Sequence, residues 1–202
     1  KEETRAFDAI LSTTPSSIFP HLIPELPADY AKNLLHVKYQ AAVLIVMTLD
    51  RPLTNVYWLN IADRSIPFVG LIEHTNFIDK ARYGGNHIVY LSNYLGKETP
   101  FYSMASEELW QNYLPSLRKI NPDFNESWVT DYTYHREDSA QPIIGVDYSQ
   151  RIPALQTPIK DLWLANTTQI YPEDRGTNYS VRLGRDVARM IIGAQPVRMW
   201  WE

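Results

Sequence analysis

The chain has 202 residues, of which 45% are hydrophobic and 12% aromatic, so it can bury a sizeable core in about one large domain or two small ones. Its formal net charge of −4 argues against a nucleic-acid partner, which favours basic surfaces. The absence of cysteine excludes disulfides, iron–sulfur ligation and a thiol nucleophile, and it fits the cytoplasmic location that we expect.

Neither a membrane span nor a metal site is predicted. The most apolar stretch, residues 41–49, has the length of a strand and is far shorter than a membrane-spanning helix. The five histidines do not have the spacing of metal ligands.

The first half of the chain is predicted to be mainly strands. Residues 7–13 form a short buried strand that ends before Pro15, and residues 28–35 form a short helix. Further strands are predicted at residues 36–49, 56–61, 68–74 and 87–94. Both faces of the strand at 87–94 are fairly apolar, so we expect it to be covered on both sides.

The second half contains two long helices. A helix is predicted over residues 106–120, with Ser106 as its N-cap and a kink or a new start at Pro115. Short strands are predicted at residues 128–135, 143–146 and 161–166, and a final amphipathic helix at 178–192.

These elements predict an α+β fold. Its sheet is mixed and largely antiparallel, with about six to eight strands and a few helices. The two ends of the chain differ in character from the middle. We therefore expect residues 1–27 and 150–202 to form one domain and residues 28–149 another.

The segment from Leu162 to Ile192 is the most informative part of the sequence. A short buried strand is followed by a polar loop that contains Gly176, and then by the final helix. The N-terminus of that helix carries unpaired N–H groups and about half a positive charge, so it favours an electron-rich or anionic ligand.

Two segments resemble a known family. Residues 7–15 (FDAILSTTP) are similar to the strand and proline by which FAD-dependent amine oxidoreductases leave the FAD domain. Residues 162–166 (LWLAN), Gly176 and the helix with Ser180 and Gly184 resemble that family's closing strand, loop and helix. The chain thus resembles roughly the C-terminal two-fifths of this group, which includes amine oxidases, protoporphyrinogen oxidase and phytoene desaturases.

The resemblance implies an enzyme that transfers a hydride from a small-molecule substrate to FAD, with most of the substrate-binding domain in this chain. Its closing motif implies that the strand end and the helix entry contact the cofactor, mainly through backbone N–H groups. The cofactor-binding residues implied are Asn166, Thr167, Arg175, Gly176, Thr177, Asn178 and Tyr179. No catalytic side chain is assigned.

The sequence departs from the family pattern at several points. Asn166 stands where the family usually has an acidic residue, and the loop from Tyr171 to Gly176 is distinctive. We expect Glu173 and Asp174 in this loop to bind a partner group or to pair with Arg175.

None of the eight glycines forms the G-x-G-x-x-G fingerprint that holds the FAD pyrophosphate. The chain also begins with Lys1 rather than Met. We therefore expect it to be part of a longer polypeptide that carries the N-terminal FAD-binding domain. Alone, it should bind no FAD tightly and be inactive, and its bared face should self-associate.

Aromatic side chains of the central strands are the candidates for binding substrate. Of these we expect Tyr57, Trp58 and Tyr90, together with His74, to line the substrate site. The same wider set of candidates also contains Tyr39, Phe68, Tyr94, Tyr132 and Tyr134, and we expect only a few of its members to face the site. Two alternatives stay open: a non-catalytic module that binds a sugar or peptide on an aromatic sheet surface, and a flavin-dependent enzyme similar to sugar-nucleotide mutases.

Overall fold

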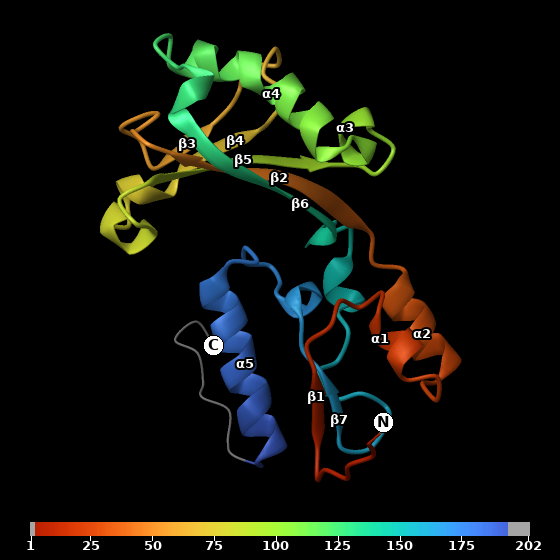
Figure 1. Cartoon of the computed structure of the whole chain (residues 1–202). Coiled ribbons are helices and arrows are strands. Elements are labelled where there is room, and N and C mark those ends of the chain that lie inside the picture. Colours follow the sequence, from red (N-terminus) through yellow and green to blue (C-terminus); the bar gives the residue numbers. More distant parts are fainter. Residues whose placement is uncertain (1–2, 194–202) are drawn as a thin grey trace. The chain divides into compact units, whose positions relative to one another are not determined.

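The computed structural model describes residues 3–193, which form two compact units (Figure 1). The first unit takes the described residues up to Lys38 and those from Pro142 onward, and the second runs from Tyr39 to Gln141. Residues 28–38 and 142–149, which the sequence groups with the central strands, pack within the first unit.

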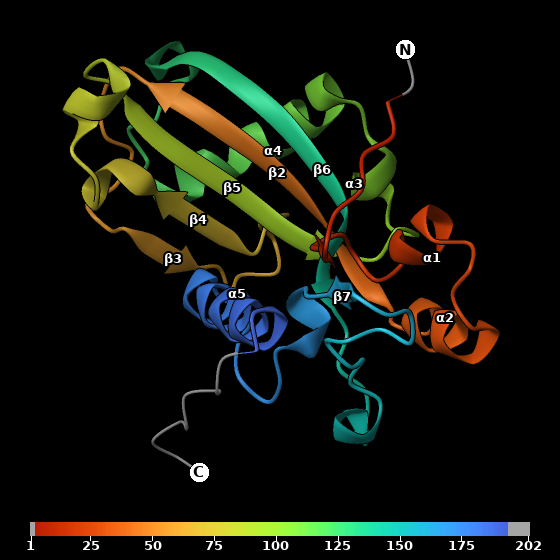
Figure 2. The same ribbon diagram turned by 90° about the horizontal axis from the view of Figure 1, so that it is seen from below.

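The second unit is built on a five-stranded sheet with the order β3-β4-β5-β2-β6 (Figure 2). The strands are β2 (Tyr39–Leu49), β3 (Trp58–Asn60), β4 (Gly70–Glu73), β5 (His87–Leu95) and β6 (Val129–Pro142). The pairs β3–β4, β4–β5 and β2–β5 are antiparallel, and β6 lies beside β2. The predicted α+β class with a largely antiparallel sheet is confirmed.

One face of this sheet packs on α4 (Ser106–Ile120), with the short helix α3 (Pro100–Ser103) on the same side (Figure 1). Alternate residues of β2, from Ala41 to Leu49, are buried, as expected for a strand with one face in the core. They pack with Leu109, Tyr113 and Leu117, which recur at helical spacing on α4. Burial of each such side chain contributes about 1.5–3 kcal/mol, so this layer holds most of the unit's stability.

Three short 3₁₀ helices complete the second unit. They are η1 (His74–Asn76), η2 (Lys80–Tyr83) and η3 (Glu126–Trp128). Figures 1 and 2 show η1 and η2, drawn in yellow, on the side of the sheet opposite to α4. The sequence did not predict these turns, because 3₁₀ segments of this length have no apolar periodicity.

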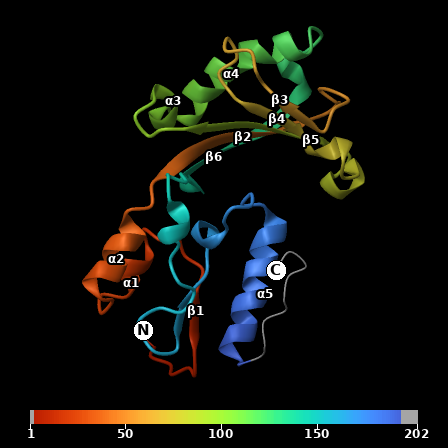
Figure 3. The ribbon, with the colours of Figure 1, turned by 180° about the vertical axis from the view of Figure 1, so that it is seen from behind.

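The first unit is a small three-layer arrangement around two parallel strands, β1 (Ile10–Ser12) and β7 (Leu162–Leu164). The helices α1 (Phe19–Leu22) and α2 (Ala28–Leu35) lie on one side of the strands, and α5 (Thr177–Ile191) lies on the other (Figure 3). The 3₁₀ helices η4 (Tyr148–Gln150) and η5 (Thr167–Gln169) lie in the connections.

The burial of β7 follows from this layering. Leu162 and Leu164 pack with Phe19 and Leu34 on the side of α1 and α2. Trp163, between them in sequence, points to the opposite side and packs with Val187 of α5. A strand that is covered on both faces reads as a continuous apolar run, which is how this segment appears in the sequence.

Several local predictions were wrong. Ala105, with extended backbone angles, is the N-cap of α4, and Ser106 is already helical. Pro115 lies inside α4, which continues through it as one helix. Residues 143–146 form no strand: the Ile143 N–H donates to the carbonyl of Lys38, and the chain then turns into η4.

Strand limits also differ from those predicted. Strand β2 begins at Tyr39 rather than at residue 36, and β6 extends to Pro142 instead of ending near residue 135. The expected cover on both faces of β5 was wrong as well. His87, Val89 and Leu91 are buried, whereas Tyr90 is half-buried and Tyr94 is exposed.

No helix among residues 3–193 has both the length and the apolar character that a membrane crossing requires.

Candidate functional site

The end of β7 is fixed by a capping box at Asn166. Its side-chain oxygen accepts hydrogen bonds from the Thr168 N–H (3.0 Å) and hydroxyl (2.7 Å), and the Gln169 side chain accepts from the Asn166 N–H (2.8 Å). The Asn166 amide group donates to the Thr14 carbonyl (2.9 Å) and the Ser16 hydroxyl (3.2 Å). These bonds tie the end of β7 to the loop that follows β1.

Buried polar contacts complete this junction. The Thr168 and Ser16 hydroxyls lie 3.1 Å apart, and the Tyr148 hydroxyl donates to the Thr168 carbonyl at 2.6 Å. Thr168 and Ser16 are fully buried, so each hydrogen bond also avoids the cost of an unsatisfied polar group. Asn166 therefore uses its side chain and its N–H to shape the strand end, while Thr167 begins η5 half-buried beside it.

The N-terminus of α5 is open. Gly176 is its N-cap, no side chain caps the first turn, and that turn holds no acidic residue. Thr177 and Asn178 are exposed, and Tyr179 is half-buried. The N–H groups of the first turn and the positive end of the helix dipole are thus left without a compensating negative side chain.

The loop before α5 is anchored by an ion pair that the sequence did not predict. Arg182 lies one helical turn beyond Tyr179 and contacts the Glu173 carboxylate at 2.6 Å, and its guanidinium lies 4.6 Å from the Tyr179 ring centroid. The hydrogen bond from Arg182 lowers the pKa of Glu173, so this carboxylate stays ionised. The Arg175 N–H donates to the Asp174 side chain at 2.9 Å. Glu173 therefore holds the loop against α5 through Arg182.

A second group of residues lies on the sheet face of the second unit that is opposite to α4. In antiparallel pairing, residues directly opposite each other share a face. The register places Trp58 opposite Ile72, Ile72 opposite Tyr90, and Tyr90 opposite Val46. Two of the predicted substrate-binding residues, Trp58 and Tyr90, thus belong to one row of this face.

The other two predicted residues join this row through ring contacts. The His74 ring packs edge-on against Tyr90 (6.0 Å between centroids) and against Tyr83 (5.4 Å), and its Nε2 lies 2.7 Å from the Tyr83 hydroxyl. The Tyr57 ring lies 6.4 Å from Trp58 and 5.2 Å from Phe77. We call this set the aromatic face; it comprises Tyr57, Trp58, His74, Phe77, Tyr83 and Tyr90.

Phe77 and Tyr83 were missed in the sequence because they lie in and after irregular turns. The only signal was their position between His74 and the turn at Gly84-Gly85. Three aromatic residues of the wider set lie elsewhere. Phe68 is buried against Tyr113, and Tyr132 and Tyr134 pack with the core beneath α4.

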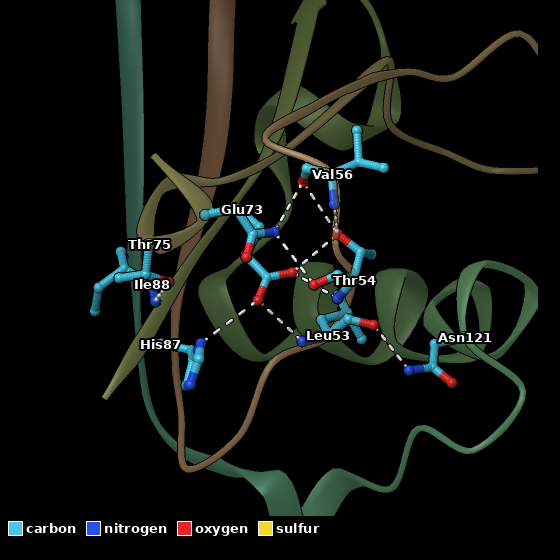
Figure 4. Close-up of polar contacts among 9 residues, drawn as sticks. Leu53, Thr54, Val56, Glu73, Thr75, His87, Ile88 and Asn121 are labelled. Atoms are coloured by element: carbon cyan, nitrogen blue, oxygen red, sulfur yellow. Dashed lines mark hydrogen bonds and ion pairs between the residues drawn. The ribbon is translucent and has the colours of Figure 1, made fainter. Parts of the chain in front are cut away.

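A buried carboxylate holds the loop that carries Tyr57 and Trp58 (Figure 4). Glu73 accepts from the Leu53 N–H (3.0 Å), the Thr54 N–H (2.6 Å) and the Thr54 hydroxyl (2.9 Å). Its own N–H donates to the Tyr57 carbonyl at 2.9 Å. These hydrogen bonds join one buried side chain to several backbone groups of the loop, so Glu73 can fix the loop in one conformation.

Two further side chains complete this anchor. Asn121 donates to the Leu53 carbonyl at 2.8 Å, and His87 Nδ1 lies 3.7 Å from a Glu73 oxygen (Figure 4). Burial lowers the pKa of His87, an effect that nearby Lys80 adds to and that Glu73 opposes. Glu73 and His87 thus act as scaffold for the aromatic face rather than as part of it.

Comparison with known proteins places this geometry in a family. The family model described as flavin containing amine oxidoreductase matches residues 1–191. The chain belongs to the flavin-containing amine oxidoreductases. A search of the curated proteins finds no match.

Several solved structures share the fold. A putative protoporphyrinogen oxidase from Exiguobacterium sp. 255-15 matches with a TM-score of 0.68 and 16% identity, over 92% of this chain and 40% of its own. A reduced UDP-galactopyranose mutase matches with a TM-score of 0.72 and 13% identity, over 95% and 42%. Putrescine oxidase matches with a TM-score of 0.69 and 14% identity, over 91% and 42%. The chain spans about two-fifths of the length of these proteins.

Proposed function

We propose that this chain is the substrate-binding and flavin-closing part of an FAD-dependent oxidoreductase that transfers a hydride from a C–N or C–C bond of a small molecule to the flavin. The single observation that carries the proposal is the open N-terminus of α5 directly after the β7 junction, in a chain that belongs to a flavin-containing family. We further propose that the rest of the protein supplies the dinucleotide-binding domain and that the protein is cytoplasmic.

The residues at the entry to α5 fit a flavin. Reduced flavin carries negative charge on its pyrimidine ring, which the free N–H groups and the dipole of a helix N-terminus can stabilise. In the proposed arrangement Gly176, Thr177, Asn178 and Tyr179 offer these N–H groups, and Arg175 adds a cationic side chain. When bound, the cofactor supplies the hydride-accepting chemistry.

The other groups of this chain have supporting roles in the proposal. Asn166 and Thr167 shape the strand end, because the capping box fixes the backbone there. Glu173 and Arg182 hold the loop so that the first turn of α5 stays open. The aromatic face orients the substrate and keeps water away from it.

The chain without a dinucleotide-binding domain is expected to bind FAD weakly and to be inactive. Binding of the pyrophosphate requires a glycine-rich turn at a helix N-terminus, and no such fingerprint occurs among the eight glycines of this chain. In a longer polypeptide that carries a strand–GxGxxG–helix unit, flavin should copurify and colour the protein yellow.

The substitution Asn178→Asp tests the flavin contact in that longer polypeptide. A carboxylate in the first turn stabilises the helix by about 0.3–1 kcal/mol, but it repels an anionic flavin ring. We expect unchanged or higher thermal stability of the flavin-free protein, together with weaker FAD retention and a lower flavin reduction potential. Stability and flavin binding thus move in opposite directions, which a general loss of folding cannot produce.

Asn55→Asp is the matched control, because Asn55 is exposed in a loop of the second unit. It adds the same charge and should change neither flavin retention nor the reduction potential. Equal behaviour of the two variants, or a longer polypeptide that purifies without flavin, would contradict the proposal.

A sugar-nucleotide mutase-like enzyme remains the second candidate. The similarity in fold to a reduced UDP-galactopyranose mutase favours it, as does the aromatic face, whose exposed rings suit stacking on a sugar. A non-catalytic module with the same aromatic face is the third. Substrate-dependent bleaching of the flavin absorbance supports the oxidoreductase, and isomerisation of a sugar nucleotide without net oxidation supports the mutase.

A further inference from the structure

We infer that His74 and Tyr83 determine specificity on the aromatic face, where they hydrogen-bond a neutral, hydroxyl-bearing ring of the sugar class that is seated on Tyr57 and Trp58. The inference rests on the proposed function in one respect, since it names the chemical class of the ring that the aromatic face binds, whichever of the candidate reactions follows. All of its residues belong to the second unit.

The orientation of the His74 ring is fixed by its neighbours. Its ring lies between those of Tyr83 and Tyr90, at interplanar angles of 83° and 75°, and its Nε2 is engaged by the Tyr83 hydroxyl at 2.7 Å. Among the described residues, Nδ1 of His74 makes no hydrogen bond. The imidazole is therefore held in place by one nitrogen while the other remains for a ligand.

Hydrogen bonds from Asn76 connect the two segments that carry the aromatic face. Asn76 of η1 donates to the Thr54 carbonyl (3.2 Å) and to the Val56 carbonyl (3.1 Å), just before Tyr57. The segment that carries His74 and Phe77 is thus tied to the loop that carries Tyr57 and Trp58. The polar pair and the stacking rings form one preorganised surface.

Several rings of the aromatic face are exposed. Phe77 is 72% exposed, Trp58 54% and Tyr57 40%. A contiguous group of exposed aromatic rings is unusual on a protein surface and marks a contact site. Flat rings of this kind stack on the apolar C–H faces of another ring.

The part of the sheet face that carries the rings is uncharged. The register places twelve residues of the recorded pairs on this face, and none of them is charged: Ala42, Leu44, Val46, Thr48, Trp58, Asn60, Gly70, Ile72, Ile88, Tyr90, Ser92 and Tyr94. A charged ligand group seated beside Trp58 and Tyr90 would lack a counter-charge among these twelve residues, because the charged side chains of β6 lie at the opposite edge of the sheet from β3. A neutral ring is therefore favoured.

Polar groups lie between the rings, and they favour a sugar over a purely apolar ligand. The Trp58 indole N–H donates to the Asn60 side-chain oxygen at 2.9 Å, which leaves the Asn60 amide group without a partner among the described residues. The Tyr57 and Tyr90 hydroxyls also lack a partner there. An apolar ligand would leave these groups and His74 Nδ1 unsatisfied, whereas ring hydroxyls can pair with them.

The experiment measures binding of small rings to the whole 202-residue chain by saturation-transfer NMR. The probes are the methyl α-D-pyranosides of glucose, galactose and mannose, compared with cyclohexylamine and cyclohexanecarboxylate, which have similar rings and opposite charges. We expect at least one glycoside to bind in the millimolar range and more tightly than either charged ring. Failure of all three glycosides, or tighter binding of a charged ring, would overturn the inference.

Tyr83→Phe and His74→Phe then test the pair. Each variant keeps an aromatic ring and removes hydrogen-bonding atoms, so glycoside binding should weaken about fivefold for Tyr83→Phe and about tenfold for His74→Phe. Tyr94→Phe is the matched control, since Tyr94 lies on the same face of β5 but about 13 Å along the strand from Tyr90, and binding should stay within about twofold. An equal loss in Tyr94→Phe would place the ligand elsewhere and overturn the inference.

Two readouts distinguish a binding role of the His74–Tyr83 pair from a structural role. Unchanged thermal unfolding of the variants excludes a purely structural role, and a lower midpoint with unchanged glycoside binding would contradict the inference. The assay contains no flavin. If the chain binds a glycoside but the longer polypeptide purifies without flavin, only the proposed function is refuted. If the longer polypeptide holds flavin but the chain binds no glycoside, only the substrate class is refuted.

Discussion

At the scale of single residues, Glu73 shows how a buried carboxyl group can serve as scaffold. It is fully buried, yet three donors from Leu53 and Thr54 satisfy its oxygens. A sequence pattern cannot reveal this role, because Glu73 ends a short strand where an exposed carboxylate is equally compatible with the pattern. The partners lie about twenty residues away in a loop without periodicity.

Glu73→Gln should destabilise the second unit by about 1–3 kcal/mol, since an amide keeps one acceptor but turns an N–H₂ group toward the loop donors. Glu108→Gln, at an exposed position on α4, should stay within about 0.5 kcal/mol. Urea unfolding followed by tryptophan fluorescence measures both. Similar midpoints for the two variants would show that the Glu73 contacts contribute little.

His87 should make stability depend on pH. Burial holds its pKa below the ordinary value of 6.5, with Lys80 acting in the same direction and Glu73 and Asp50 against it. Below about pH 6.5 the unfolded chain therefore binds a proton that the folded chain does not, so the free energy of unfolding should fall as the pH decreases toward the folded pKa. Above that range the contribution is constant.

The comparison of unfolding at pH 7.5 and at about pH 5.5 in His87→Gln and His36→Gln checks this prediction. His36 is exposed, so its replacement should leave the pH dependence as in the original chain. His87→Gln should flatten it. If the free energy of unfolding depends on pH in His87→Gln as it does in the original chain, His87 is not the source of this dependence.

At the scale of elements, the junction between β7 and η5 depends on Asn166. Asn166→Asp keeps the oxygen that accepts from Thr168 but replaces the amide that donates to the Thr14 carbonyl, so two oxygens would face each other. We expect a loss of about 1–3 kcal/mol in the stability of the first unit, measured by hydrogen exchange of the β1 and β7 amides. Asn55→Asp should leave this protection unchanged. Full protection in Asn166→Asp would show that an acidic residue fits equally well.

The elements that the sequence predicted are those with a strong apolar period. Helix α4 has the predicted limits, and α5 differs by one residue at each end. Strand β2 was recognised as a continuous apolar run of strand length, and the structure shows that alternate residues of it are buried. By contrast, β6 continues through Arg136, Glu137 and Asp138. These charged residues do not have the apolar pattern of a strand, and the segment is a strand because its backbone pairs with the sheet.

The candidate site likewise has features that could be predicted from the sequence and features that could not. The strand–loop–helix order around Gly176 is a local pattern and could be predicted, as could the gathering of aromatic residues in the central strands. The Glu173–Arg182 pair, the capping box and the His74–Tyr83 pair could not, because each depends on how turns place side chains. Irregular segments are where sequence patterns carry least information and where binding residues are concentrated.

At the scale of the whole molecule, the two parallel strands of the first unit leave apolar surface uncovered. Phe7 is 69% exposed, Ile10 52% and Leu11 37%, at the edge of a sheet of only two strands. An isolated two-stranded sheet is marginally stable, and an open apolar edge promotes pairing with another chain. We therefore expect the isolated chain to self-associate, with a weight-average sedimentation coefficient that rises with concentration.

A charged residue on the exposed edge should suppress this association. Ile10→Lys places a cation on β1, a substitution that blunts pairing between strand edges. Val146→Lys, at a residue that is 85% exposed in a loop of the same unit, adds the same charge away from the edge and should leave association unchanged. If both variants associate equally, the contact lies elsewhere. If the original chain sediments as a monomer at every concentration, the apolar edge of β1 is tolerated in water, and the prediction of self-association is wrong.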